Sequence, residues 1–505
     1  MGSRRTGAWS GLAAGAMAVG TATGLAAVTR PIGLTSPAAA PVVSAGGAGV
    51  DRVPLWLKNL AVSAFGTADK AVLLTGVLVV LAAACAAIGV VAMRRSGIGL
   101  WLFTGLGIVG ILVVLSRPAA TIADVLPMGI GTGLGLALLA RSVRDADGAE
   151  SRGVTRRTLL GGALGVGIGL LGARPWSAGA TRPVPTGAAT LPAPARPLPT
   201  FTGVNPGVPG QTPYIIPAAD FYRIDTALSV PEVDAATWSL RVHGMVDKEV
   251  VLTYDELLAE SLQEQLVTLT CVSNEVGGDL CGNAVWTGWP VRNLLARVGV
   301  HPDADMVLST SVDGWTAGTP LTALTDRRDA LLAVAMNGEP LPAEHGYPVR
   351  LVVPGLYGYV SATKWVTDLK VTRFDADQGY WTPRGWSALG PVKTASRIDV
   401  PRDSTQAQRT ADGLVAVAGV AWAQHRGISR VEVRVDEGPW VEADLAAEPS
   451  IDAWRQWVYR WPAAPGRHTL TVRATDGTGA VQTDQVQRSD PDGATGHHSV
   501  TVEVV

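Results

Sequence analysis

The chain has 505 residues, a formal net charge of −2, three cysteines, and charged side chains at 17% of its positions. This length predicts about three domains, and a charged fraction below the roughly 25% of soluble domains indicates membrane segments. The near-neutral balance argues against a nucleic-acid binder that uses a broad basic patch, and three cysteines exclude a disulfide-built scaffold and a four-cysteine zinc site.

The first third of the chain is its most apolar part. Five stretches there carry almost no charge: 8–29, 71–93, 98–115, 118–140 and 158–172. The first four have close to the ~20 residues that cross a bilayer, and Asp124 is the acidic residue within the fourth. The fifth is shorter and rich in glycine. We therefore predict a membrane anchor of about five transmembrane helices over residues 1–175.

Basic residues give this anchor a direction. Arginines cluster at the N-terminus, at 94–95 and at 141–157, whereas the intervening loops carry fewer. Because cytoplasmic loops are enriched in Lys and Arg, the N-terminus is expected inside and everything after residue 175 outside the cytoplasm. Arg156 and Arg157 resemble an internal twin-arginine export signal, although such a pair also marks the cytoplasmic end of an ordinary span.

Two further features of this part bear on cofactors. No histidine precedes His243, so paired histidines cannot hold a haem between the membrane helices, and no haem is expected. The glycine runs at 129–135 and 165–169 lack the strand–turn–helix setting of a dinucleotide site. We expect them to serve close helix packing instead.

Three regions follow the anchor. Residues 176–213 are rich in Pro, Thr, Ala and Gly without an apolar period, which predicts an extended linker. Residues 214–390 mix short helical and strand patterns, which is typical of an α+β domain. Residues 391–505 carry apolar runs between Gly, Pro and Asp turns, which predicts an immunoglobulin-like β-sandwich of the kind used for binding or dimerisation. The candidates for chemistry therefore lie within 214–390.

Cys271 is the first of these candidates. It ends a β-rich apolar run and is followed by polar residues and glycines, which places a thiol at the mouth of a sheet, where loops bind ligands. A disulfide with Cys281 in an oxidising compartment is one interpretation. A soft thiolate ligand for a metal ion is the other.

The second candidate is the segment 345–364. Arg350 and Lys364 bracket a glycine-containing hairpin, and His345 precedes Arg350 by five residues. Arginine offers a planar fork and lysine a point charge to a phosphate. Isolated cations of this kind are usually solvated charges at strand ends, but the glycines favour a ligand that approaches the backbone closely.

The Cys271 segment, the segment 345–364 and residues 220–225 together resemble the sulfite oxidase family of molybdopterin-dependent oxidoreductases, in a membrane-anchored bacterial form. The resemblance covers about 214–390, and the C-terminal sandwich resembles the family's dimerisation domain. It implies one molybdenum–molybdopterin per chain, with Cys271 as the metal ligand. The implied activity is a two-electron oxygen-atom transfer on a small substrate such as sulfite or a sulfoxide.

The site residues are carried over by the same resemblance. Those expected to bind the cofactor are Tyr222, Arg223, Asp225, Ser311, His345, Arg350, Ser361 and Lys364. Ser361 and Lys364 are expected to close the phosphate pocket beside Arg350. The expected catalytic residues are Cys271, Arg223, Arg384 and Trp386.

Two departures from the family pattern affect the substrate. Sulfite oxidases carry an arginine shortly after the ligand cysteine to hold an oxyanion, whereas Asn274, Glu275 and Val276 stand here. Trp386 stands where those enzymes have their active-site tyrosine. The related periplasmic reductases of methionine sulfoxide share the fold, so both kinds of substrate stay open.

The implied partners are a small-molecule substrate, the membrane and an external electron carrier, which is a cytochrome, a membrane subunit or a quinone. A homodimer through the C-terminal domain is also implied. A Ser–His–Asp hydrolase has little support, because no G-x-S-x-G turn occurs. Two alternatives remain: a membrane-anchored binding or adhesion protein without redox activity, and a chain that keeps the pterin fold but has lost activity. Metal content separates the first of these from the enzyme and from the second.

Overall fold

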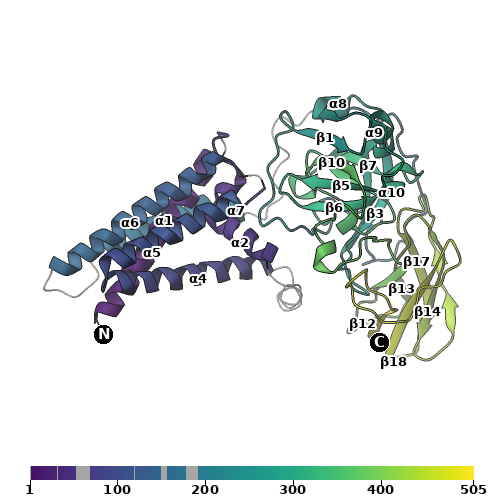
Figure 1. Cartoon of the computed structure of the whole chain (residues 1–505). Coiled ribbons are helices and arrows are strands. Elements are labelled where there is room, and N and C mark those ends of the chain that lie inside the picture. Colours follow the sequence, from purple (N-terminus) through teal and green to yellow (C-terminus); the bar gives the residue numbers. More distant parts are fainter. Residues whose placement is uncertain (1, 31, 53–68, 119, 149–155, 178–190) are drawn as a thin grey trace. The chain divides into compact units, whose positions relative to one another are not determined.

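The computed structural model describes residues 2–30, 32–52, 69–118, 120–148, 156–177 and 191–505. They form two compact units (Figure 1). A helical unit extends to residue 180 and takes in residues 226–231, and a larger β-rich unit contains the rest. Residues 178–190, which belong to the predicted linker, lie outside the described residues.

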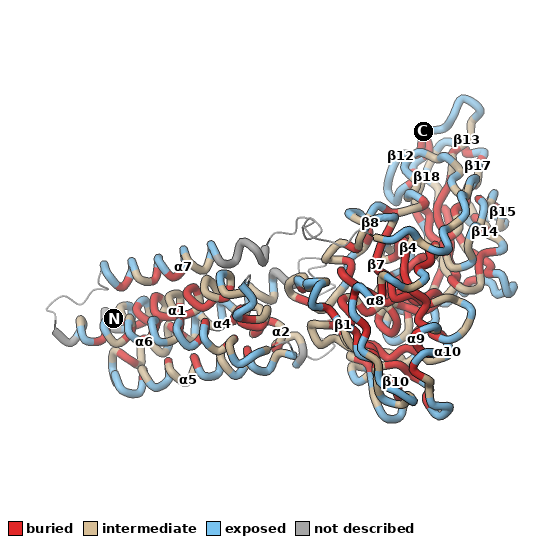
Figure 2. The backbone as a smooth tube through the Cα atoms, turned by 90° about the horizontal axis from the view of Figure 1, so that it is seen from above, coloured by how far each residue is buried: buried red, intermediate tan, exposed pale blue. Residues whose placement is uncertain are grey.

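The helical unit is built around its first helix. The elements are α1 Gly2–Thr29, η1 Pro37–Ala39, α2 Pro41–Arg52, α4 Asp69–Ala92, α5 Ser96–Leu115, η3 Ile122–Asp124, α6 Val125–Gly148 and α7 Arg156–Ser177. Helices α4, α6 and α7 all pack against α1, and α5 packs against α4 and α6. Along α5, α6 and α7 buried or half-buried residues alternate with exposed ones, whereas most residues of α1 are buried or half-buried (Figure 2).

Glycines set the spacing between α1 and its neighbours. A Cβ added at Gly20 would lie 1.8 Å from the carbonyl oxygen of Gly165, and one added at Gly131 would lie 2.3 Å from that of Ala18. Gly135, one turn after Gly131, meets α1 in the same way. Small residues let membrane helices approach to backbone contact. The predicted role of the glycine runs is therefore confirmed at these positions of α6 and α7.

The same contacts give the directions of the helices. Gly162 of α7 lies against Ala13 of α1, and Ile168, further along α7, lies against Gly24, further along α1. Helices α1 and α7 therefore run parallel. The chain leaves α7 at the same end of the unit at which it leaves α1.

Four helices are long and apolar enough to cross a membrane: Arg4–Thr29, Val72–Ala92, Ser96–Leu115 and Ile122–Ala146. They correspond to four of the five predicted stretches. The fifth stretch lies in α7, which is not among these helices in the part of the chain that the structure describes.

Asp124 explains why the fourth helix begins later than the predicted residue 118. Its buried carboxylate accepts hydrogen bonds at 2.6 Å from the backbone N–H and the hydroxyl of Ser36 and from the backbone N–H of Thr121. Asp124 is the third residue of η3 and accepts from Thr121, the residue before this turn, as in a capping box. The turn η3 therefore precedes the helix, and α6 begins at Val125, later than the start of the predicted apolar stretch.

The first part of the β-rich unit contains two sheets. Their strand orders are β2–β1–β10–β5–β6 and β3–β4–β7–β8, with β9 paired to β7. The strands are β1 Ser239–Gly244, β2 Val250–Thr253, β3 Gln263–Thr270, β4 Cys281–Pro290, β5 Met306–Ser311, β6 Thr316–Pro320, β7 Leu331–Met336, β8 Glu339–Pro340, β9 Arg350–Val352 and β10 Val366–Thr372. The helices and 3-10 turns are α8 Tyr254–Leu258, α9 Val291–Val298, α10 Leu321–Thr325, η4 Ala343–His345, η5 Gly358–Val360 and η6 Thr382–Arg384. This mixture confirms the expected α+β domain.

The C-terminal part is formed by two further sheets, with the orders β11–β13–β17–β16 and β12–β19–β18–β14–β15. The strands are β11 Ala395–Val400, β12 Thr405–Ala407, β13 Leu414–Trp422, β14 Ile428–Val435, β15 Trp440–Glu442, β16 Asp444–Leu445, β17 Arg455–Pro462, β18 Gly466–Asp476 and β19 His498–Val504. Both sheets contribute to one apolar core, which contains Val417 and Trp457 from the first and Val433 and Leu470 from the second. Alternating apolar residues therefore build a two-sheet packing, as the sequence predicts.

The two parts of the β-rich unit are joined by buried polar contacts. Gln424 donates from Nε2 to the carbonyl of Thr268 and to the hydroxyl of Thr270, both at 2.9 Å. Trp454 donates its backbone N–H to the hydroxyl of Thr268 at 2.7 Å and its indole N–H to the carbonyl of Tyr214 at 3.0 Å. The C-terminal part thus supports the end of β3, directly before Cys271.

The described end of the predicted linker, 191–213, lies along this unit. The backbone N–H of Leu198 donates to Glu264 at 2.9 Å, and Gln211 donates to the carbonyl of Gly419 at 2.9 Å. These residues are therefore attached to the β-rich unit and do not form a free spacer.

Candidate active site

Cys271 lies where β3 ends and the loop to β4 begins. Its backbone N–H donates to the carbonyl of Leu280 at 2.9 Å, and its own carbonyl accepts from the N–H of Asn274 at 3.1 Å. The side chain of Asn274 also accepts from the N–H of Leu280, at 2.8 Å. Cys271 and Cys281 are both free thiols. The structure therefore has a free thiol at the start of a partly exposed loop, as the metal-ligand interpretation requires, and it has no disulfide between Cys271 and Cys281.

The Cys271 thiol has a buried polar environment. Burial raises its pKa, and hydrogen bonds from the backbone and side chain of Ser273 offset part of the rise. Burial also raises the pKa of Tyr222 well above its ordinary value and that of Tyr357 to about 12, and a charge on Cys271 contributes in both cases. Both phenol groups therefore lie close enough to Cys271 for a charge on its sulfur to affect them. Because a buried thiol ionises poorly alone, a bound cation would be needed to hold it as thiolate.

Two cationic side chains bind a single carboxylate in the same region, and a third lies nearby. Lys364 donates to Oδ2 of Asp225 at 2.7 Å, and Arg223 donates to the same oxygen at 3.0 Å. Arg350, which is 5% exposed, donates to the carbonyl of His345 at 3.1 Å and lies 4.9 Å from the ring of Trp286. Three positive charges against one negative charge leave an excess of two.

The pKa values of this cluster show the effect of burial. Burial lowers the pKa of Arg350 to about 10 and that of Lys364 to about 8, and Asp225 offsets part of the change at Lys364. Burial lowers the pKa of His345 to about 4, with smaller effects from neighbouring cations. His345 is therefore neutral at physiological pH, and its Nε2–H donates to the carbonyl of Ala218 at 2.8 Å.

The hydroxyl groups of the site fall into two classes. Ser361 is fully buried, but its hydroxyl donates to the carbonyl of Tyr357 at 2.9 Å, so it already has a partner. The buried hydroxyl of Ser311 has none in the described part of the chain. Ser309, two residues earlier on β5, shares a 2.7 Å hydrogen bond with Thr363. The sequence analysis missed Ser309 and Thr363, although alternation along β5 places Ser309 and Ser311 on one face.

Gly346 lets the two main cations of the cluster approach each other. It has φ +110°, and a Cβ added there would lie 3.0 Å from Cβ of Arg350 and 3.1 Å from Cβ of Lys364. The glycine seen in the sequence therefore has a steric reason: a larger residue would push the cations apart.

Gly346→Ala is expected to destabilise the β-rich unit by ~2 kcal/mol or more, since both a positive φ and a collision oppose the new Cβ. Gly338→Ala is the matched control, because Gly338 also has a positive φ (+82°) but no atom within 4 Å of an added Cβ. Urea unfolding of the two variants measures the difference. Equal midpoints would show that backbone strain alone matters and that the cluster tolerates the extra atom.

An aromatic group containing Trp386 lies beside the Cys271 region. The ring of Trp386 is 5.8 Å from that of Tyr359 and 6.1 Å from that of Trp381. Tyr359 belongs to η5, whose first residue, Gly358, lies near the carbonyl of Thr270. Trp386 thus packs on η5, the turn that lies against the end of β3, and its predicted catalytic role stays a prediction.

Arg384 is held by Tyr380. Its guanidinium lies 3.7 Å from the centre of the Tyr380 ring and donates to the Tyr380 carbonyl at 2.5 Å. This arginine is therefore attached to the aromatic group. Its predicted catalytic role stays a prediction.

The C-terminal part adds side chains that the sequence analysis did not assign to the site. Buried Arg397 donates to the carbonyl of Gly278 at 2.8 Å and lies 3.9 Å from the sulfur of Cys281. The ring of His498 lies directly against Gly277. Both side chains hold the loop that follows Cys271. No local signal marks them, because they are more than 100 residues from that loop in the sequence.

These features fit a ligand that combines a phosphate with a soft metal ion. The excess positive charge, the partnerless hydroxyl of Ser311 and the close approach at Gly346 suit a phosphate. A free thiol suits a soft metal. In the described part of the chain no three His, Cys, Asp or Glu side chains form a metal-binding group, so Cys271 would be a single protein ligand.

Comparisons with known proteins give the same picture. The family model "Oxidoreductase molybdopterin binding domain" matches residues 227–381. The chain is 34% identical over 157 residues to "Uncharacterized oxidoreductase YuiH" of Bacillus subtilis, covering 31% of this chain and 76% of that protein. It is 30% identical over 320 residues to "Sulfite oxidase, mitochondrial" of Mus musculus, covering 54% of this chain and 58% of the mouse protein. The chain thus spans little more than half the length of that relative.

A solved structure supports the fold. The chain resembles "Sulfane Dehydrogenase SoxCD" from Paracoccus pantotrophus with a TM-score of 0.51 and 24% sequence identity, covering 58% of this chain and 82% of that one. At this identity the likeness concerns the fold alone.

Proposed function

Since the chain belongs to the sulfite oxidase family of molybdopterin-dependent oxidoreductases, we propose that it is a membrane-anchored, extracytoplasmic enzyme that transfers an oxygen atom to or from a small substrate. The observation that carries the proposal is the net positive cluster around Asp225, in which Asp225, Lys364 and Arg350 are largely buried, in the same region as the free thiol of Cys271. A binding or adhesion protein has no use for either feature.

One molybdopterin per chain would be held by the residues already described. Arg350 and Lys364 would hold its phosphate, Tyr222 and His345 would contact the pterin, and Cys271 would ligate the metal. When bound, this cofactor supplies a metal ion that changes its oxidation state by two electrons during oxygen-atom transfer.

The protein's own groups would position the cofactor and the substrate. Cys271 would hold the metal as a thiolate, since only the deprotonated sulfur is a good ligand. Tyr222 has a strongly raised pKa, so it keeps its proton at neutral pH and can donate a hydrogen bond beside the thiol. The half-buried rings of Trp381 and Trp386 restrict water on the same side.

The charge of the loop after Cys271 favours a substrate without negative charge. Glu275 and Asp279 are exposed in this loop. Val276, which is 37% exposed, lies near Gly496, and Gly496 also contacts the exposed Val486 of the β18–β19 loop. As a border of the substrate site, this acidic and apolar loop would repel an oxyanion and accommodate a neutral molecule. These contacts support an uncharged substrate, such as a sulfoxide, over sulfite.

Electrons would pass to or from an external carrier: a cytochrome, a separate membrane subunit or a quinone. The two C-terminal sheets would form an immunoglobulin-like module through which two chains associate. Size-exclusion chromatography with light scattering of the detergent-solubilised chain measures this association.

Five membrane crossings are supported by the direction of α7. This helix runs parallel to α1 and in contact with it, and apolar side chains such as Leu160, Leu164 and Leu170 are exposed along it. If α1 crosses from the cytoplasm, α7 crosses in the same direction, and the β-rich unit follows on the outside.

Reporter fusions test this topology. An extracytoplasmic reporter is expected to be active after residues 45 and 200 and inactive after residues 96 and 146, because basic residues flank the latter two on the cytoplasmic side. A reporter that is inactive after residue 200 would contradict the external placement and remove the reason for an export signal at Arg156 and Arg157.

Metal analysis tests the function itself. The full chain, produced in cells that make the cofactor, is expected to contain about one molybdenum and one pterin per chain. Folded protein that lacks both molybdenum and the fluorescence of oxidised pterin would instead support the binding or adhesion protein.

A further inference from the structure

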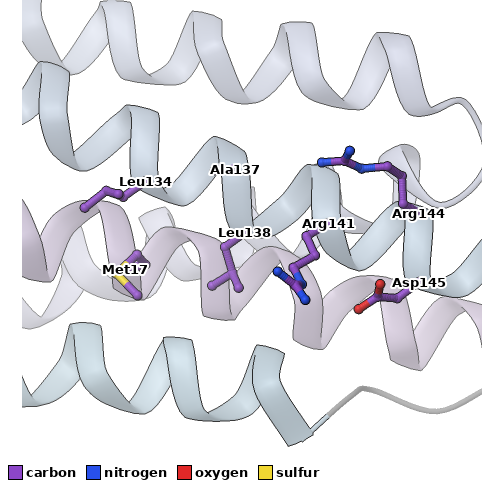
Figure 3. A pocket seen from close by; sticks show the side chains of 7 residues that line it. All are labelled: Met17, Leu134, Ala137, Leu138, Arg141, Arg144 and Asp145. Carbon is purple, nitrogen blue, oxygen red and sulfur yellow. The ribbon is translucent and has the colours of Figure 1, made fainter.

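A pocket of about 600 Å³ lies along α1 and α6 in the helical unit (Figure 3). One of its walls is apolar and is formed by Met17 of α1 together with Leu134 and Leu138 of α6. Leu134 is 48% exposed, so this wall faces outward and not into the packed centre of the helices. The hydrocarbon chain of a bound molecule would cover this wall and pack against it.

The end of the pocket is charged. Arg141, Arg144 and Asp145, near the C-terminal end of α6, complete the lining. Both arginines are exposed, and among the residues that the structure describes neither forms an ion pair or a side-chain hydrogen bond. Two guanidinium groups against one carboxylate leave a net charge of +1, which an anionic group would balance.

The start of α7 adds positive charge next to this end. The hydroxyls of Ser142 on α6 and Thr158 on α7 share a buried 2.9 Å hydrogen bond. This contact brings the exposed Arg156 and Arg157 to the same end of the unit. The anionic group would therefore meet a wider basic surface than the pocket alone provides.

We propose that the pocket binds one anionic phospholipid, with an acyl chain along Met17, Leu134 and Leu138 and the headgroup phosphate at Arg141 and Arg144. The proposal rests on the membrane anchoring proposed above, which places these arginines at the cytoplasmic face, where basic pockets between helices bind acidic headgroups. A quinone would leave the guanidinium charges unbalanced. A free phosphate would leave the apolar wall uncovered.

Native mass spectrometry of the full chain in a neutral detergent measures the binding. Phosphatidylglycerol and phosphatidylcholine with identical acyl chains are added at equal concentrations. We expect phosphatidylglycerol to be retained preferentially, and the double variant R141Q/R144Q to bind it roughly thirtyfold more weakly, at ~1 kcal/mol for each basic residue. The matched control is R94Q/R95Q, which removes two exposed arginines from the turn between α4 and α5 and is expected to change the affinity less than twofold.

A second variant tests the apolar wall without a change of charge. Ala137 lines the pocket and is exposed, so Ala137→Phe can fill the space without disturbing the helix packing, and it is expected to release phosphatidylglycerol. The proposal would be overturned if the two lipids bind equally or if Ala137→Phe retains phosphatidylglycerol fully. It would also be overturned if R94Q/R95Q loses as much affinity as R141Q/R144Q, or if inorganic phosphate at the lipid concentration displaces the lipid. Extraction of the chain from membranes by alkaline carbonate would instead show that the membrane anchoring itself fails.

Discussion

Replacing Cys271 with serine is expected to lower turnover by ~10³-fold or more while the β-rich unit stays folded. A single preorganised donor in an active site is already worth ~10²–10³ in kcat, and a hydroxyl cannot replace a thiolate at a soft metal ion. The fold should persist, because Ser273 provides hydrogen bonds at this position that a hydroxyl can also accept. Circular dichroism, molybdenum content and turnover of the purified variant measure the three effects.

Cys281→Ser is the matched control for this variant. Cys281 is also a buried free thiol, and it lies at the other end of the same loop. Its pKa is raised to about 11, mainly by burial, so it stays protonated and is expected to tolerate the change with nearly full activity. If both variants lose activity equally and the oxidised protein shows a 271–281 disulfide by mass spectrometry, the assignment of Cys271 as metal ligand is wrong.

Local patterns predicted the parts of the site that are close in the sequence. The apolar run that ends at Cys271 indicated a strand with a thiol at its mouth, and the structure has this arrangement. Arg350 and Lys364 were paired from their places around a glycine hairpin, and Gly346, just before this hairpin, packs against both of them. Such features depend on a few neighbouring residues, and strand alternation and glycine geometry make them visible.

Contacts between distant segments could not be predicted in the same way. Gln424 supports β3 from the C-terminal part, and Arg397 and His498 hold the loop after Cys271. A single sequence contains no signal that brings these segments together. The start of α6 was missed for a related reason, because the partner of Asp124 is Ser36, on a segment 88 residues earlier.

Lys364 is expected to make cofactor retention depend on pH above about 8. Without the cofactor, burial lowers the pKa of Lys364 to about 8, so its charge is lost above that pH. A bound phosphate favours the charged form and raises this pKa, so binding above pH 8 requires the uptake of a proton. The affinity should therefore fall by up to about tenfold per pH unit above 8 and stay constant below it.

The lowered pKa of Lys364 also affects the stability of the cofactor-free protein, but with a dependence on pH opposite to that of cofactor affinity. Between pH 8 and the ordinary lysine pKa of 10.5, the unfolded chain keeps a proton that the folded chain has lost. The contribution of Lys364 to the free energy of unfolding should therefore rise with pH across this window, whereas buried groups with raised pKa values, such as Cys281, contribute with the opposite sign. The test is therefore a difference: urea midpoints of the cofactor-free unchanged protein and of Lys364→Met at pH 7.5, 9 and 10 should diverge in favour of the unchanged protein as the pH rises.

Variants of the two cations separate cofactor binding from catalysis. Lys364→Met and Arg350→Ala each remove a charge-assisted contact worth ~1.5–3 kcal/mol, so pterin occupancy should fall by roughly ten- to a hundredfold while turnover per bound pterin is kept. Lys370→Met is the control. Lys370 lies in β10, directly after the segment of Lys364, and also pairs with an aspartate, Asp377, but its side chain is 39% exposed and lies outside the cluster. Activity that is lost at full pterin occupancy would place Arg350 and Lys364 at the substrate. Occupancy that falls above pH 8 in the Lys364→Met variant as steeply as in the unchanged protein would show that another group binds the proton.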